Sequence, residues 1–250
     1  MSDASSDAGA ARRALDRLLE TDAPALRASL PPGFADAAEH YIELLLDANQ
    51  RLNLTRLVDP ADVARLHVLD ALSALPLLDE LAPRRALDLG SGGGVPGIVL
   101  ALARPEVPWV LVDSVRRKAD AMRGFVDALG LRNVTVLAER AEILGREAAF
   151  RERFDVVAAR ACAALPVLAE YALPLVRIGG AVVAWKGTVG DAEMNAGRAA
   201  GSQLGGAAFE VHSTGMRALG DHQLVMMRKV GPTPERYPRR PGQPAKRPLG

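Results

Sequence analysis

Cysteine is nearly absent from this chain of 250 residues, and the single Cys162 precludes an internal disulfide. No apolar run approaches the roughly 18 residues that a membrane-spanning helix needs. The N-terminus also lacks the basic start and apolar stretch of a secretory signal. These absences argue against a disulfide-stabilised secreted fold and against a membrane protein. We therefore predict a cytoplasmic protein with no membrane partner.

An excess of one charge is also lacking, because the net charge is only +1. The charges are nevertheless unevenly distributed. Residues 1–80 carry 14 acidic and 7 basic side chains, whereas residues 228–250 carry 1 acidic and 7 basic ones. A basic terminal segment suits a phosphate backbone. A solvated terminus with no partner explains the same composition equally well.

The pattern of residue types divides the chain into four parts. Residues 1–10 are small and polar, and we predict that they are disordered. Apolar residues at three- and four-residue spacing predict an N-terminal helical subdomain over residues 11–83. Residues 84–230 form the main domain, and residues 231–250, rich in proline, glycine and arginine, are expected to form an irregular basic arm.

Short apolar runs alternate with helical patterns throughout the main domain. This alternation predicts βαβ units and a mostly parallel sheet of seven strands. Only about ten residues separate the last two runs, which suits an antiparallel pair at the end of the chain. The predicted strands are Arg85–Leu89, Trp109–Asp113, Val134–Ala138, Phe154–Ala158, Ala181–Trp185, Phe209–Ser213 and Leu224–Arg228, and the predicted helices lie near Gly97–Ala103, Arg116–Leu129, Glu142–Phe150 and Leu165–Val176.

The first of these strands ends in a glycine-dense turn. The spacing Gly92-x-Gly94-x-x-Gly97 formally matches a dinucleotide fingerprint, which holds a pyrophosphate at a helix N-terminus. The spacing Asp88-x-Gly90-x-Gly92-x-Gly94 matches the pattern of proteins that bind S-adenosylmethionine (SAM) better. SAM has no phosphate but carries an ammonium group, which the carboxylate of Asp88 can hold. We therefore favour SAM over NAD as the cofactor.

The second strand ends in Asp113 and Ser114, about 20 residues beyond the glycines. A carboxylate at this place can accept hydrogen bonds from both ribose hydroxyls of a bound nucleotide. NAD-dependent and SAM-dependent enzymes share this feature, so it does not discriminate between them. A plain turn with a solvated Asp113 is the alternative.

Several further motifs occur in order between about Tyr41 and Leu249. They include Leu52–Thr55, His67–Leu72, Leu87–Ile98, Arg117-Lys118, Arg140–Glu142, Arg160-Ala161, Lys186-Gly187, His222 and Tyr237–Arg240. With these motifs the chain resembles the bacterial small-subunit ribosomal RNA guanine-N7 methyltransferases (the RsmG or glucose-inhibited division protein B family). The resemblance implies a Rossmann-like SAM-dependent methyltransferase domain with an N-terminal helical extension, whose target is guanine N7 in the decoding-region loop of 16S ribosomal RNA.

The resemblance also implies which residues contact SAM. The donor contacts of the family map onto Gly90, Val95, the Ala141-Glu142 pair and Arg160, with Ala141 and Glu142 near the adenine. The family often has an aromatic residue where this chain has Cys162, so we expect the cysteine to be a small, buried, non-catalytic residue.

Attack by guanine N7 needs no general base, because this nitrogen already has a free lone pair. Alignment of the two reactants can then supply most of the rate enhancement. The segment Ala158–Ala161 lacks the Asn/Asp-Pro-Pro-aromatic cluster that methylation of an exocyclic amine uses. Arg160 is the catalytic candidate, with its guanidinium on guanine O6, a phosphate or the SAM carboxylate. Its alternative role is a structural salt bridge.

RNA contacts are expected from basic residues outside the SAM site. His67 and Asp70 lie three residues apart on one helical face and could meet, either in an RNA pocket or as a structural pair. Lys186 ends the fifth strand and could reach a phosphate or remain solvated. In the arm we expect Arg239, Arg240 and Lys246 to bind RNA, and removal of residues 232–250 to leave SAM affinity intact. No metal site is expected.

The predicted partners are 16S ribosomal RNA and the small ribosomal subunit or its precursor, and the predicted state is a monomer. Three rival interpretations remain open at this stage. They are an NAD-dependent oxidoreductase, a methyltransferase acting on a protein or small molecule, and a non-catalytic RNA-binding module with the same fold.

Overall fold

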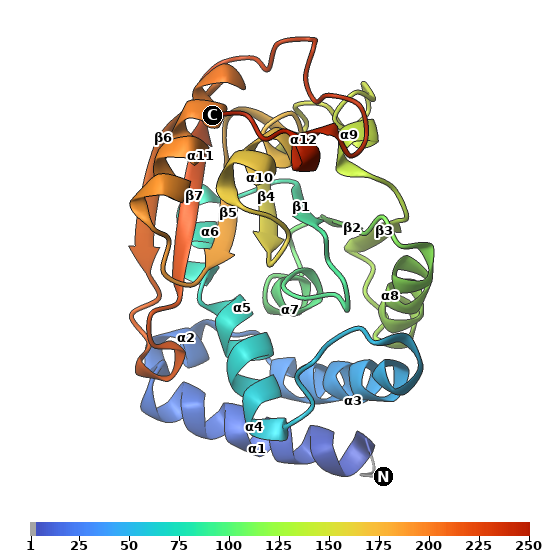
Figure 1. Cartoon of the computed structure of the whole chain (residues 1–250). Helices are drawn as coiled ribbons and strands as arrows, with labels where there is room; N and C mark the ends of the chain where they lie inside the picture. The colour runs from blue at the N-terminus through green and yellow to red at the C-terminus, as the bar shows by residue number, and fades with distance from the viewer. Residues whose placement is uncertain (1–3) are drawn as a thin grey trace.

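A seven-stranded sheet lies at the centre of the computed structural model, which describes residues 4–250 (Figure 1). The strand order is β3-β2-β1-β4-β5-β7-β6. β1 to β5 are parallel, whereas β7 runs antiparallel to both β5 and β6. The predicted sheet is therefore confirmed. Its strands are β1 (Ala86–Leu89), β2 (Trp109–Val112), β3 (Val134–Leu137), β4 (Phe154–Arg160), β5 (Val176–Lys186), β6 (Gly206–Ser213) and β7 (Gln223–Lys229).

Two hydrophobic cores lie on opposite faces of the sheet, because successive residues of a strand point to opposite sides. Ala86 and Leu111 belong to the core that also contains the N-terminal helices, α7 and α8. Leu87 and Val110 belong to the core that contains α10 and α11. The helices of this part are α7 (Gly97–Ala103), α8 (Arg116–Ala128), α9 (Ala141–Leu144), α10 (Leu165–Ala172), α11 (Asp191–Gln203), η2 (Arg217–Leu219) and α12 (Gln243–Lys246).

The N-terminal helices share their core with the sheet rather than forming a core of their own. Tyr41 makes one polar link between the two parts, because its buried hydroxyl donates to the carbonyl of Gly93 at 2.8 Å. The helices are α1 (Ala4–Thr21), α2 (Pro24–Ser29), α3 (Phe34–Leu52), α4 (Pro60–Asp62), the π-helix η1 (Val63–Leu69), α5 (Asp70–Leu72) and α6 (Leu75–Leu81).

The prediction of disorder over residues 1–10 is wrong for residues 4–10, which belong to α1. Ala8, Ala11 and Leu15 are buried and recur at three- and four-residue spacing, so one face of this helix packs against the core. Residues 1–3 lie outside the described part of the chain.

Helix α11 has no counterpart among the predicted helices. It is rich in glycine and alanine and therefore has a weak apolar pattern. Gly197 and Gly201 face Leu165 and the ring of Phe209, where an added Cβ would lie as close as 2.6 Å to the ring. Small residues thus let this helix approach the sheet closely. The helix predicted near residues 142–150 is also shorter, because α9 ends at Leu144.

The C-terminal arm packs against the body, next to α9 and α10 (Figure 1). Arg239 forms an ion pair with Glu170, whose side chain is 0% exposed. Arg151 donates to the carbonyls of Tyr237 and Thr233. The amide of Gly242 donates to the buried carboxylate of Glu142 at 2.7 Å. The expected irregular arm is therefore a fixed part of the fold and contains the short helix α12.

The Arg239–Glu170 ion pair gives a testable prediction about stability. We expect Arg239→Ala to lower the free energy of unfolding by about 3–5 kcal/mol, because it leaves the buried Glu170 carboxylate without its partner. Urea unfolding monitored by circular dichroism measures this loss. The matched control is Arg240→Ala, which alters an exposed neighbour and should change stability by less than about 0.5 kcal/mol. Equal effects of both substitutions would contradict the assigned role of Arg239.

Candidate functional site

The glycine loop after β1 is held at the carboxyl edge of the sheet by Asp113. The carboxylate of Asp113 accepts from the amide of Gly92 at 3.0 Å and from the amide of Val115 at 2.8 Å. Gly90 and Gly94 have φ angles of 74° and 98°, in the left-handed region that favours glycine. The structure thus places Asp113 as a clamp on the loop. Its predicted contact with a ribose stays a prediction.

A first cavity of about 200 Å³ opens on one side of this loop. Gly90 and Ser114 contribute to it from the ends of β1 and β2, and Ala141 and Glu142 contribute from α9. Tyr171 of α10 lines the same space. The complete lining is Leu89, Gly90, Val112, Ser114, Glu139, Arg140, Ala141, Glu142, Cys162 and Tyr171.

A second cavity of about 200 Å³ lies on the other side of the loop and shares Gly90 with the first. Gly92 and Val95, two predicted cofactor residues, line it together with Thr55 and Arg160. Gly94 is not part of this lining, because it packs under the loop against Ile98 and the Tyr41 hydroxyl. The two cavities are therefore neighbours at Gly90.

Asp88 lies beneath the loop with its side chain fully buried. One carboxylate oxygen accepts from the amide of Gly97 at 2.9 Å, whereas Oδ1 has no hydrogen-bond partner among the described residues. Burial raises the pKa of Asp88 to about 6. A buried carboxylate with an unused oxygen is suited to hold a cationic ligand, and the ammonium group of SAM fits this requirement.

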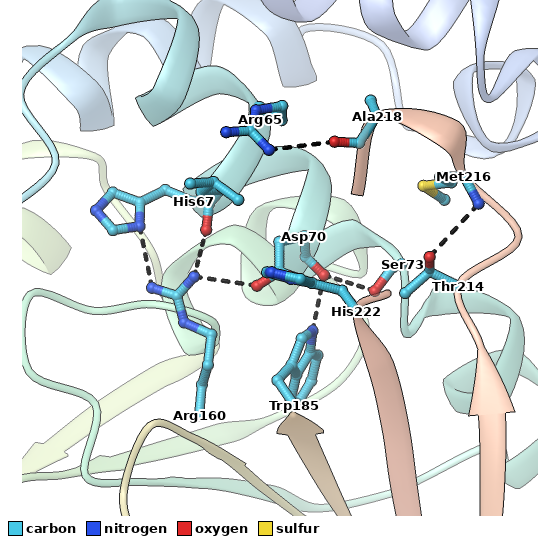
Figure 2. A network of polar contacts seen from close by, with 11 residues as sticks. Arg65, His67, Asp70, Ser73, Arg160, Trp185, Thr214, Met216, Ala218 and His222 are labelled. Atoms are coloured by element: carbon cyan, nitrogen blue, oxygen red, sulfur yellow. Dashed lines mark hydrogen bonds and ion pairs between the residues drawn. The ribbon is translucent and has the colours of Figure 1, made fainter. Parts of the chain in front are cut away.

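Arg160, at the end of β4, connects the sheet to the N-terminal helices. Its Nη1 donates to the carbonyl of Leu66 and to Asp70, and its Nη2 donates to His67 at 3.0 Å (Figure 2). Arg160 thus binds both His67 and Asp70, whereas no hydrogen bond within residues 4–250 joins these two side chains directly. The guanidinium has five N–H groups and these bonds use three, so two are left for a ligand.

His67 is neutral near physiological pH. Burial and the positive charge of Arg160 together lower the pKa of His67 to about 4. Arg160 can only donate, so Nδ1 of His67 accepts and the ring proton resides on Nε2. Nε2 then donates to the hydroxyl of Thr55 at 2.8 Å. Both ring nitrogens are thus occupied, and His67 positions Arg160 within the described structure.

A third cavity of about 410 Å³ lies beyond Arg160 and shares His67, Arg160 and Ala161 with the second. Its far wall is formed by Trp185, Lys186 and Gly187 at the end of β5 and by His222 before β7. Lys186 donates to the carbonyl of Ala163 and to Glu193, so its ammonium group is already paired.

Other predicted residues lie elsewhere. Arg239 forms an ion pair with the buried carboxylate of Glu170, so its predicted contact with RNA has no support in the geometry. Arg240 and Lys246 are exposed. Cys162 is exposed at the first cavity, so the expectation of a buried residue is wrong. The short β4–α10 loop turns at Ala161, which has a φ angle of 52°, and this turn carries Cys162 to the surface.

Other lining residues carry only weak signals in the sequence. Thr55 and His222 belong to motifs that assign them no role, and Trp185 and Tyr171 belong to no chemical motif. Their contribution depends on which loops meet at the carboxyl edge of the sheet. Over residues 4–250, no group of three or more His, Cys, Asp or Glu side chains could hold a metal ion. No helix in this range is long and apolar enough to cross a membrane.

Comparison with known proteins gives consistent matches. A family model described as GidB, rRNA small subunit methyltransferase G, matches residues 35–224. A ribosomal RNA small subunit methyltransferase G from Moorella thermoacetica is 40% identical over 94% of this chain and 98% of that protein. The protein of the same name from Deinococcus radiodurans is 44% identical, and the match covers 83% of each chain.

Solved structures show the fold. A putative S-adenosylmethionine-dependent methyltransferase from Methanococcus maripaludis superposes with a TM-score of 0.53 and 11% sequence identity, covering 75% of this chain and 91% of that one. The S-adenosylmethionine-dependent methyltransferase SibL superposes with a TM-score of 0.52 and 16% identity, covering 88% and 74%. The chain therefore has the Rossmann-like fold of these methyltransferases.

The buried His67 predicts a loss of stability in acid. Its folded pKa of about 4 lies below the ordinary value of 6.5, so the unfolded chain takes up a proton first as the pH falls. Stability that is fully present above pH 6.5 should be lost progressively down to about pH 4, by an amount on the order of 3 kcal/mol. His67→Asn keeps an acceptor for Arg160 but does not titrate. The free energy of unfolding, measured by urea unfolding between about pH 5 and pH 7, should therefore rise less steeply with pH for the variant than for the unaltered protein. The same pH dependence for both proteins would contradict the low pKa assigned to His67.

Proposed function

Because the chain belongs to the GidB family of rRNA small subunit methyltransferases, we propose that it transfers a methyl group from SAM to N7 of one guanine in the decoding-region loop of 16S ribosomal RNA. The observation that carries this proposal is the row of three cavities. They meet at Gly90 and at Arg160, so a donor and an acceptor have adjacent places.

The first two cavities and the residues around them fit SAM. The adenosine would lie against Ala141, Glu142 and Tyr171, and the amino-acid end would lie beside Gly92, on the loop that covers Asp88. Gly90 is the residue that the linings of the two cavities share. A Cβ on Gly90 would lie 3.1 Å from the sulfur of Cys162. When bound, SAM supplies a methyl group on a positively charged sulfur.

The acceptor proposed here needs no deprotonation. His67 has both ring nitrogens occupied and Asp88 lies beneath the loop, so neither is placed to act as a general base. His222, in the wall of the third cavity, is left to contact the acceptor base. Guanine N7 attacks through a free lone pair, so the protein acts by holding the two reactants in line.

Arg160 stands at the wall between the donor and acceptor cavities, with two N–H groups left for a ligand. An N–H group at this wall suits guanine O6, which lies next to N7 on the same edge of the base and accepts hydrogen bonds. An N–H group bonded to N7 itself would occupy the lone pair and block the attack. We therefore assign Arg160 to O6 as the residue that contacts the acceptor.

We infer that the acceptor is 16S ribosomal RNA in the small ribosomal subunit or its precursor, and that the protein acts as a cytoplasmic monomer. Arg240 and Lys246 are the exposed basic residues of the arm that we assign to RNA phosphates. Lys186 keeps this assignment only if RNA displaces its contact with Glu193. Membership of the family speaks against an NAD-dependent oxidoreductase and against a protein or small-molecule acceptor.

A transfer assay tests the proposal directly. Tritium-labelled SAM is mixed with the protein and with small ribosomal subunits from a strain that lacks the activity. We expect label in 7-methylguanosine at a single site of the RNA. Gly90→Val should abolish transfer, because its side chain would meet Cys162 at the wall that the first two cavities share, whereas Gly124→Ala, in open space on α8, should not. Label in protein or small molecules, with none in RNA, would overturn the proposal.

Asp88 predicts how SAM binding depends on pH. Its raised pKa of about 6 means that the carboxylate loses its proton, and so attracts the SAM ammonium group, only as the pH rises through this value. The dissociation constant for SAM should therefore fall about tenfold between about pH 5 and pH 7. Isothermal titration calorimetry measures this change.

Two variants test whether Asp88 causes this pH dependence. Asp88→Asn should bind SAM weakly at every pH, with a flat profile. Asp120→Asn changes an exposed carboxylate on α8 and should keep the profile of the unaltered protein. A flat profile for the unaltered protein would show that Asp88 does not hold the ammonium group.

A further inference from the structure

The third cavity contains a polar pair that methyl donation does not use. Nδ1 of His222 lies 3.0 Å from Oδ1 of Asp70 (Figure 2). A carboxylate can only accept, so in the neutral imidazole the proton resides on Nδ1 and the lone pair lies on Nε2. Nε2 has no protein partner among residues 4–250, and the His222 side chain is 39% exposed in the wall of the cavity.

Asp70 is held so firmly that it fixes the direction of His222. Its carboxylate side chain is 3% exposed, and the second oxygen, Oδ2, accepts from Arg160 at 3.2 Å. Its main-chain carbonyl accepts from the indole N–H of Trp185 at 2.7 Å and from the hydroxyl of Ser73 (Figure 2). Every oxygen of Asp70 thus has a partner.

The loop that carries His222 is fixed on its other side by the N-terminal helices. Arg65 donates to the carbonyl of Ala218 at 3.2 Å. The carboxylate of Asp22 accepts from the amides of Arg217 and Ala218. These contacts set the position of His222 before any ligand arrives, as a preorganised recognition site requires.

We propose that the third cavity holds the acceptor guanine and that Nε2 of His222 accepts a hydrogen bond from its N1–H group. This inference rests on the proposed function. Arg160 and Ala161 stand at the wall shared with the donor cavity, whereas His222 lines the third cavity only. N7 and O6 of guanine face one way, and N1–H lies beyond O6 on the Watson–Crick edge. A base with N7 toward the donor and O6 toward Arg160 therefore presents N1–H to the side where His222 lies.

The same contact favours the reaction. Bonding of N7 to the methyl carbon, with departure of the neutral thioether, leaves a positive charge on the purine ring. This charge makes N1–H a stronger hydrogen-bond donor in the transition state than in the free base. An acceptor at N1–H, oriented by the carboxylate of Asp70, is stabilising where the charge develops. Adenine has an acceptor at N1 and would meet the lone pair of Nε2 unfavourably, so His222 also selects guanine.

A test combines a side-chain deletion with a change in the base. The protein is assayed with two otherwise identical RNAs, which carry guanosine or 1-methylguanosine at the mapped target. With the unaltered protein, 1-methylguanosine should reduce N7 methylation about 10- to 100-fold, because it lacks the N1–H donor and its methyl group meets His222. His222→Ala should be slower on guanosine by a similar factor, with the SAM dissociation constant unchanged.

The decisive result is the combination of the two changes. In His222→Ala the contact is already lost and there is space for the added methyl group. The variant should therefore methylate N7 of guanosine and of 1-methylguanosine at the same rate. The inference would be overturned if 1-methylguanosine slowed His222→Ala by the same factor as it slows the unaltered protein. Full activity of His222→Ala on guanosine would overturn it as well. Equal rates of the unaltered protein on both RNAs would overturn it even if His222→Ala failed to bind SAM.

His40→Ala is the matched control, because this histidine is exposed on α3, away from the cavity. It should behave as the unaltered protein with both RNAs. Absence of transfer from the unaltered protein to the guanosine RNA would mean that the proposed function itself is wrong. Normal transfer with no effect of His222→Ala would overturn only the role of His222.

Discussion

The guanidinium of Arg160 connects the parts of this molecule on which the site depends. It leaves the end of β4, the strand next to β1 in the sheet, and binds the carbonyl of Leu66 and the side chains of His67 and Asp70. A half-buried charge with three protein acceptors holds its position much better than a solvated one. This side chain therefore fixes the wall between the donor and acceptor cavities. Asp70, which it binds, is in turn hydrogen-bonded to Trp185 and His222.

The helices before the sheet are part of the site for the same reason. Leu66, His67 and Asp70 all lie in or next to η1, the π-helical turn over Val63–Leu69. Such turns are rare and occur frequently at functional sites, because they redirect successive backbone groups. Tyr41 and Leu45 from α3 also contact Gly93 of the glycine loop. The N-terminal helices and the sheet thus form one structural unit around the cavities.

The sheet could be predicted from the sequence because its evidence is local. Each of the seven strands contains a short apolar run, and the spacing between runs distinguishes parallel from antiparallel neighbours. The start of β5 was not predictable, because residues 176–180 include Arg177 and two glycines, and the helix predicted over Leu165–Val176 ends earlier, at Ala172. The glycine loop with Asp88 and Asp113 was predictable for the same reason. Helix α11 was not, because its packing depends on small residues such as Gly201, which leave no apolar pattern.

Ion pairs and hydrogen bonds between residues far apart in the chain could not be predicted from the sequence. Arg239 was predicted to bind RNA because it lies in a basic segment, but Glu170, 69 residues earlier, neutralises it in the fold. The role of His222 depends on Asp70, 152 residues away, and no spacing rule connects the two. Composition predicts how much charge a segment carries, and only the packed chain decides which charges are left for a ligand.

The position of the C-terminal arm has a consequence for how the first cavity is supported. The amide of Gly242 donates to the carboxylate of Glu142, a residue of the cavity wall that lies 100 residues earlier in the chain. The arm thus has a structural role besides the RNA contacts expected of it, and the expectation that its removal leaves SAM affinity intact stays a prediction. No residue of the arm lines the cavity itself, so a substitution in the arm can alter the wall only from behind, through Glu142.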